Sequence, residues 1–212
     1  MKKQTGFTLI EVIVVIAVVA ILAAILTPTI AKQIQDSRIS RTKNETMVIG
    51  AAISDLRKDT GWWPYASPSD PSTTAVDTIV GDQNTVPTDA DNNAANWGSS
   101  SSTAEIYHYL YYNDPNLNDT ENESPGDYPT TGEFKWNGPY IKDKYLSDPW
   151  GRSYVVNAKY FPGNPNGAGT GRHNVYVLSA GPDRSWSTPF DDGTTEEEIA
   201  GDDIGFRICV RK

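Results

Sequence analysis

The chain has 212 residues, with 18 lysines and arginines against 27 aspartates and glutamates, which gives a net charge of −9. This acidic balance argues against nucleic acid as a main partner, because phosphate backbones are bound by clustered positive charge. Cys209 is the sole cysteine, so an intrachain disulfide is excluded, and stability must come from a core or a bound metal.

The first predicted element is an apolar helix that follows a short basic leader, residues 1–6. Residues 7–26 are apolar apart from Thr8 and Glu11. At about 1.5 Å per residue they span roughly 30 Å, the thickness of a bilayer core. A carboxylate at the centre of such a helix costs on the order of 3 kcal/mol, and somewhat less near its end. The segment contains no Lys, Arg or His, so we expect Glu11 to find its partner elsewhere, which favours assembly.

Two simpler interpretations of this segment compete with assembly. A secretory signal peptide has an apolar core of about 7–15 residues and a small-residue cleavage site. The run here is longer and no such site follows it. A plain signal anchor would leave Glu11 unexplained. Lys2 and Lys3 predict a cytoplasmic leader and a C-terminal domain outside the inner membrane.

One long helix is predicted over residues 7–27 and 28–60, kinked at Pro28 and ending before Gly61. Its first half is expected to be membrane-embedded and its second half amphipathic. The apolar positions of the second half are Ile30, Ile34, Val48, Ala52 and Leu56.

Residues 61–137 form a loop-rich insertion dominated by Pro, Ser, Thr, Asp, Asn and Gly. Within it, the pattern of Thr103–Tyr112 predicts a short helix with Ser102 or Thr103 as its N-cap. Three Asn-x-Ser/Thr triplets could carry sugar, but a plain polar surface is favoured because the triplet is a common chance match. The triplets begin at Asn44, Asn118 and Asn122.

Residues 138–212 are predicted to form a small antiparallel sheet and an acidic loop, which makes the fold class α+β. Two strand-like runs, 153–156 and 174–179, flank a turn rich in Gly, Asn and Pro. The loop beyond them is rich in carboxylates, whose oxygens suit calcium, although Asp and Gly also fill ordinary solvated turns. These carboxylates are Asp183, Asp191, Asp192, Asp202 and Asp203.

Four motifs resemble the type IV pilin and pseudopilin superfamily, and most closely the major pseudopilin of type II secretion systems. The first is Gly6 followed by Phe7-Thr8-Leu9-Ile10-Glu11 inside the apolar run. The others are Asp148-Pro149-Trp150-Gly151, Val177–Asp183 and Asp202-Asp203-Ile204. The resemblance covers about residues 1–65 and 138–206, and the insertion departs from it.

The resemblance implies processing and assembly roles for three N-terminal residues. A prepilin peptidase is expected to cut between Gly6 and Phe7 and to methylate Phe7. Glu11 is expected to pair with the freed amine of a neighbouring subunit. A charge pair in low dielectric is favourable only when both members are desolvated together, and side-by-side packing of protomers would do this.

The resemblance also implies calcium ligands in the acidic loop. These are Asp183, Asp202 and Asp203, with a main-chain oxygen near Leu178. The pair Asp191 and Asp192 is the alternative. The spacing is not that of an EF-hand.

No enzymatic activity is expected, because the sequence has no zinc motif, nucleophile elbow or phosphate-binding glycine loop. The predicted function is that of a filament subunit, a major-pseudopilin-like component of type II protein secretion. Its expected partners are copies of itself, the prepilin peptidase, an inner-membrane assembly platform, minor pseudopilins and a secreted cargo. The chain would cross the inner membrane once before assembly, with a periplasmic C-terminal domain. The alternative is a type IV pilin of a surface fibre used for motility, adhesion or DNA uptake.

Overall fold

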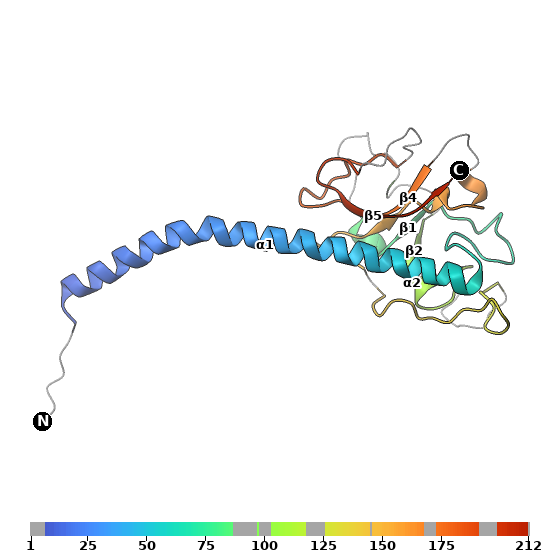
Figure 1. The fold of residues 1–212 in the computed structure, drawn as a ribbon, viewed down its shortest axis with the longest axis horizontal. Coiled ribbons are helices and arrows are strands. Elements are labelled where there is room, and N and C mark those ends of the chain that lie inside the picture. The colour runs from blue at the N-terminus through green and yellow to red at the C-terminus, as the bar shows by residue number, and fades with distance from the viewer. Residues whose placement is uncertain are drawn as a thin grey trace, which may run out of the picture. The chain divides into compact units, whose positions relative to one another are not determined.

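The computed structural model describes residues 7–86, 97, 103–117, 126–144, 146–167, 173–190 and 199–211. The chain divides into two compact units, Met1–Ser40 and Arg41–Lys212. Helix α1 (Leu9–Thr60) has residues in both units (Figure 1). Each unit is described separately below.

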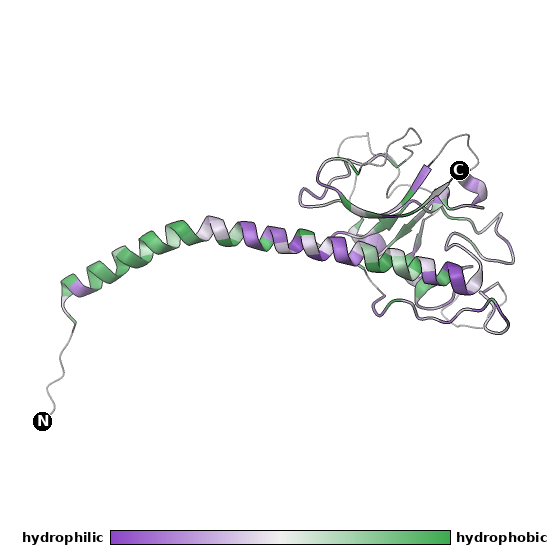
Figure 2. Ribbon diagram, in the orientation of Figure 1, coloured by the Kyte–Doolittle hydropathy of each residue, from purple (hydrophilic) through white to green (hydrophobic). Residues whose placement is uncertain are grey.

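In the first unit, α1 is apolar from Leu9 to Leu26 apart from Glu11 (Figure 2). The large apolar side chains of this stretch are exposed. Within the described residues, α1 is the one helix long and apolar enough to cross a membrane. The helix continues through Pro28. Beside it the Thr27 hydroxyl donates to the Ala23 carbonyl over 2.7 Å and the Thr29 hydroxyl to the Ile25 carbonyl over 3.4 Å. The predicted long helix is therefore confirmed, with bounds that differ by a residue or two.

In the second unit, α1 buries one stripe and ends as expected. The Gly61 N–H donates to the Arg57 carbonyl over 3.0 Å, and Gly61 has a φ of +80°, as a helix C-cap requires. Val48 was predicted on the buried face, but it is 64% exposed, and Ile49 takes that place. The buried positions recur every three or four residues, as one helical face requires. They are Thr42, Thr46, Ile49, Gly50, Ala52, Ile53, Leu56 and Thr60.

The second unit contains a five-stranded sheet in the order β2-β1-β3-β4-β5 (Figure 1). The strands are β1 (Thr78–Val80), β2 (Thr103–Glu105), β3 (Val155–Val156), β4 (His173–Ser179) and β5 (Ile204–Arg211). The predicted antiparallel pairing of the 153–156 and 174–179 runs is confirmed by β3 and β4. The sheet as a whole is mixed, because β1 and β2 are parallel.

The described part of the insertion contains more regular structure than its composition predicts. It contributes both β1 and β2 to the sheet. The predicted helix at Thr103–Tyr112 is wrong in its first part, where Thr103–Glu105 extends as β2 and only Ile106–Leu110 forms helix α2. Glu105 occupies the N-cap without a side-chain hydrogen bond. Pairing with β1 therefore outweighs the local helix signal.

Close packing of α1 on the sheet depends on a glycine. A Cβ atom built on Gly50 would lie 2.5 Å from Cδ1 of Phe206 and 3.7 Å from Cγ1 of Ile208, both on β5. Real Cβ atoms essentially never come that close to another heavy atom, so the helix and β5 approach each other where a side chain is missing. Ile53 and Leu56 of α1 and Val177 of β4, all fully buried, belong to the same apolar core.

Candidate functional site

The acid in the apolar helix has a local partner that the sequence analysis left out. The backbone N–H and the hydroxyl of Thr8 both donate to Oε2 of Glu11, over 2.8 and 2.7 Å. The Glu11 N–H donates in return to the Thr8 hydroxyl over 3.4 Å. Thr8 immediately precedes α1, so the pair is a capping box, Thr-x-x-Glu, at the N-terminus of the helix.

The capping box changes the energetic argument for Glu11. Backbone donors and the helix dipole favour a carboxylate in the first turn, which offsets part of its insertion cost. Thr8 brings no positive charge, and its contacts use only Oε2. Phe7 is 88% exposed, while Gly6 lies outside the described residues. The geometry leaves Glu11 able to accept a cationic partner.

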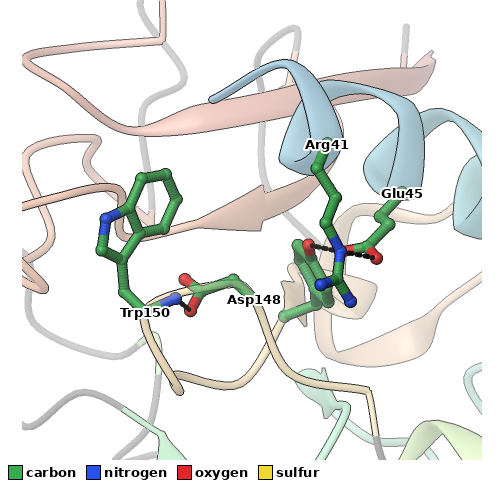
Figure 3. A network of polar contacts seen from close by, with 5 residues as sticks. Arg41, Glu45, Asp148 and Trp150 are labelled. Atoms are coloured by element: carbon green, nitrogen blue, oxygen red, sulfur yellow. Dashed lines mark hydrogen bonds and ion pairs between the residues drawn. The ribbon is translucent and has the colours of Figure 1, made fainter. Parts of the chain in front are cut away.

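Within the second unit, a polar network joins α1 to the segment before β3, beside the Asp-Pro-Trp-Gly motif (Figure 3). Nε of Arg41 lies 2.7 Å from Oε1 of Glu45, and the Tyr154 hydroxyl donates to Oε2 of Glu45 over 2.5 Å. Burial and the neighbouring Glu45 raise the pKa of Tyr154, so its hydroxyl stays protonated and donates. The network fixes α1 against the strand that follows Tyr154.

The side chain of Asp148, the first residue of the Asp-Pro-Trp-Gly motif, holds the turn of that motif in place. Oδ1 accepts hydrogen bonds from the Trp150 and Arg152 N–H groups, each at 2.9 Å, and the first is drawn in Figure 3. Oδ2 accepts from the Ser179 hydroxyl at 2.6 Å, at the end of β4. Asp148 is 4% exposed. Its role is to hold the turn against β4, since a buried carboxylate needs such donors.

The predicted calcium ligands lie on two adjoining loops at the end of β4 and the start of β5. The Asp183 N–H donates to Oδ2 of Asp202 over 3.0 Å, so the two segments are in contact. Oδ1 of Asp183 accepts from the Ser185 N–H at 2.8 Å. The predicted main-chain ligand, Leu178, lies within β4, paired in register with Gly205 of β5.

Asp203 is the buried member of the set, at 8% exposure. Its Oδ2 accepts from the N–H groups of Ser187 and Thr188, at 3.0 and 2.7 Å. Oδ1 is buried and accepts no hydrogen bond from any of the residues described. Burial raises the pKa of Asp203 to about 6, aided by the charge of Asp202 and opposed by the donors at Thr188 and Ser187.

These residues fit a hard cation in one respect. A buried carboxylate oxygen without a partner, next to a second carboxylate, offers the donor type that calcium prefers. In the described part of the chain, however, no three carboxylate, histidine or cysteine side chains converge. The alternative ligands Asp191 and Asp192 lie outside the described residues.

One comparison with known proteins concerns the N-terminal segment. Residues 1–27 match the family described as the prokaryotic N-terminal methylation motif. The chain carries the N-terminal methylation motif of type IV pilins. This is the segment in which Gly6, Phe7 and Glu11 were singled out from the sequence.

Two curated relatives share part of this chain. A fimbrial protein, EcpC, of Eikenella corrodens is 41% identical over 63 residues, which are 30% of this chain and 41% of the relative. The type II secretion system core protein G of Pseudomonas aeruginosa is 32% identical over 63 residues, 30% of this chain and 44% of the relative. The chain thus spans less than half the length of either relative. No solved structure matches it.

Proposed function

We propose that this chain is a structural subunit of a pilus-like filament that assembles from the inner membrane, as the major pseudopilin of a type II secretion system does. One observation carries the proposal. The methylation motif leads directly into a helix whose apolar side chains are exposed and whose first turn holds Glu11. Such a surface needs lipid before assembly and neighbouring helices after it.

Processing supplies the charge that Thr8 lacks. Cleavage between Gly6 and Phe7 by a prepilin peptidase frees a positive amine on Phe7, which the enzyme then methylates. In the low dielectric of a helix bundle, that amine of one subunit and Glu11 of the next stabilise each other. Growth of the filament by this pairing requires no catalytic residue in the chain, so its role is mechanical.

The partners follow from this role. The subunit polymerises with copies of itself, starts from an inner-membrane assembly platform, and is joined by minor pseudopilins. Its C-terminal domain is periplasmic, and the growing filament acts on a secreted cargo. The relative named as a type II secretion core protein supports this assignment.

Calcium is proposed as a structural ligand of the two acidic loops. The predicted ligands Asp203, Asp202 and Asp183 would have to close around the ion on binding, because no three such side chains converge among the described residues. The charge of the ion would then offset the buried Asp203 carboxylate. Chelation should lower the melting temperature of the full chain in detergent, and Asp183→Ala should reproduce that loss. An unchanged melting temperature with chelator would remove calcium from the proposal.

A surface type IV pilin is the second candidate. It is supported by the fimbrial relative, whose matched segment has the higher identity of the two. The insertion, absent from the resemblance, adds residues that a fibre used in adhesion or DNA uptake would display. In that case the filament would extend outside the cell.

The test is expression of the chain with a prepilin peptidase and an assembly system, followed by intact-mass analysis and electron cryomicroscopy. We expect a mature protein beginning with N-methylated Phe7 and a helical filament. The Gly6→Leu control should remain unprocessed in the membrane. Filaments confined to the periplasm favour the secretion role, and fibres on the cell surface favour the pilin. A mature protein that begins at Met1 and never polymerises contradicts both.

A further inference from the structure

Two Asn-Gly pairs, Asn137-Gly138 and Asn166-Gly167, have different surroundings in the structure. An Asn-Gly pair can lose its side-chain amide without an enzyme, when the glycine nitrogen attacks the side-chain carbonyl carbon of the asparagine. Glycine favours this attack because it has no side chain to obstruct the approach and its backbone turns freely. Hydrogen bonds that hold the amide or the glycine N–H slow the reaction, because they must break first.

The reacting groups of the second pair are both held by hydrogen bonds. Nδ2 of Asn166 donates to the Ala75 carbonyl over 3.1 Å and to Oδ1 of Asp77 over 2.9 Å. The N–H of Gly167, which would supply the attacking nitrogen, donates to the Asn164 carbonyl over 3.3 Å. Gly167 is also buried. Asn166 is therefore restrained, although it lies at the surface.

The first pair lacks these restraints. Asn137 is exposed and lies outside any helix or strand. Among the described residues, neither its side-chain amide nor the Gly138 N–H makes a hydrogen bond. The backbone N–H of Asn137 donates to the Tyr140 hydroxyl over 3.0 Å, and that hydroxyl donates to Oδ2 of Asp59 over 3.0 Å. The main chain is thus anchored to the end of α1 while the amide is free to turn.

Packing requires the glycine of this pair. A Cβ atom built on Gly138 would lie 2.4 Å from Cζ2 of Trp136, closer than real Cβ atoms come to another heavy atom. The fold therefore keeps at position 138 the residue that favours the reaction of Asn137.

We propose that Asn137 is a site of spontaneous deamidation in the folded chain, whereas Asn166 is protected. A bond forms between the Gly138 nitrogen and Cγ of Asn137, the bond from Cγ to Nδ2 breaks, and the Gly138 proton leaves with the amide as ammonia. Water then opens the resulting succinimide ring at either of its carbonyls. One opening gives aspartate, and the other gives isoaspartate, in which the main chain runs through the former side-chain carbonyl. Either product carries a new carboxylate near the end of α1.

The test incubates the full chain in detergent micelles, in mildly alkaline buffer made with heavy-oxygen water, and locates the incorporated label by peptide mass spectrometry. The same chain unfolded in urea is the reference, because both pairs then react at rates set by their local sequence. We expect folding to change the rate at Asn137 little. It should slow Asn166 at least about tenfold, since two hydrogen bonds must break to free its amide. Asn137→Gln is the negative control, because its longer side chain closes a ring far more slowly.

The central comparison lies within one wild-type chain, so it needs no folded variant. Asn137 that stays unlabelled in the folded chain, while the unfolded chain takes up label there, would overturn the inference. Asn166 that reacts as fast in the folded chain as in the unfolded one would also overturn it. Asp77→Ala removes one acceptor of the Asn166 amide and should raise the folded rate at Asn166 about tenfold without altering Asn137. An unchanged rate at Asn166 in this variant would contradict the assigned cause of protection.

Discussion

Thr8 and Glu11 cap the first turn of α1 in both directions, with the Thr8 N–H and hydroxyl on Oε2 and the Glu11 N–H on the Thr8 hydroxyl. The same carboxylate thus has two separable properties. It closes a capping box, which glutamine can also do, and it carries a negative charge, which glutamine cannot. Only the charge can pair with a neighbour's amine.

Glu11→Gln and Thr8→Ala should separate these properties. We expect Glu11→Gln to keep the helix start and to reduce filament yield at least tenfold, because the charge pair is lost. Thr8→Ala removes a cap worth about 1 kcal/mol and should reduce the yield far less. Filament yield is measured by shearing and sedimentation, with membrane insertion of each variant as the control. Equal yields from wild type and Glu11→Gln would refute the pairing role.

Tyr154→Phe tests the contact between α1 and the sheet domain. Loss of the hydroxyl removes a 2.5 Å hydrogen bond to Glu45, and a bond to a charged group contributes about 1.5 kcal/mol. We expect the melting temperature to fall by about 3–6 °C, followed by circular dichroism. Tyr112→Phe, a half-buried tyrosine elsewhere in the domain, is the control. Equal falls in melting temperature in the two variants would show that the hydrogen bond from Tyr154 to Glu45 adds no stability of its own.

Much of the fold could be predicted because its signals are local. The apolar run, Gly61 and the alternating β-branched residues of β4 each act over a few neighbours, and each was confirmed. The parallel pairing of Thr78–Val80 with Thr103–Glu105 could not be predicted, because strands of three residues carry no periodic pattern. Val48 was misplaced because Thr42 and Thr46, both polar, lie on the buried face and shift the stripe.

The contact of Gly50 with β5 also could not be predicted, because it joins segments that are far apart in the sequence. Nothing near it in the sequence indicates that Phe206 lies against it, yet a Cβ there would be 2.5 Å from the ring. We expect Gly50→Val to destabilise the domain by about 2 kcal/mol, since overpacking costs about 1–3 kcal/mol. Valine is only a slightly better helix former than glycine, so the gain in helix propensity offsets little of that cost.

A double-mutant cycle with Phe206→Ala checks the assignment of that cost. If the clash is with the ring, Gly50→Val should cost less in the Phe206→Ala background, with a coupling of at least about 0.5 kcal/mol. Chemical denaturation of the four proteins in detergent gives the free energies. Additive effects would place the cost elsewhere.

The residues of the candidate sites also divide into those that the sequence indicates and those that only the structure shows. Glu11 and the acidic loops stood out because charge in an apolar run, or clustered carboxylates, is visible in the sequence. The capping role of Thr8 was also readable, from the Thr-x-x-Glu spacing, and was missed. The hydrogen bond from the Thr188 N–H to Asp203 could not be read, because it joins residues 15 positions apart.

Asp203 should make the stability of the chain depend on pH when chelator is present. Burial raises its pKa to about 6, so between about pH 4 and 6 the folded state holds a proton that the unfolded chain has released. Its contribution to stability is therefore greatest below about pH 4 and is lost as the pH rises through 6. A pKa raised from 3.8 to about 6 corresponds to about 3 kcal/mol of unfolding free energy. Melting curves of wild type and Asp203→Asn, taken at each pH, isolate this contribution as their difference. Calcium should flatten or reverse the dependence of that difference on pH, because calcium stabilises the ionised carboxylate. A difference that does not depend on pH in chelator would show that Asp203 has the same pKa in the folded and unfolded states.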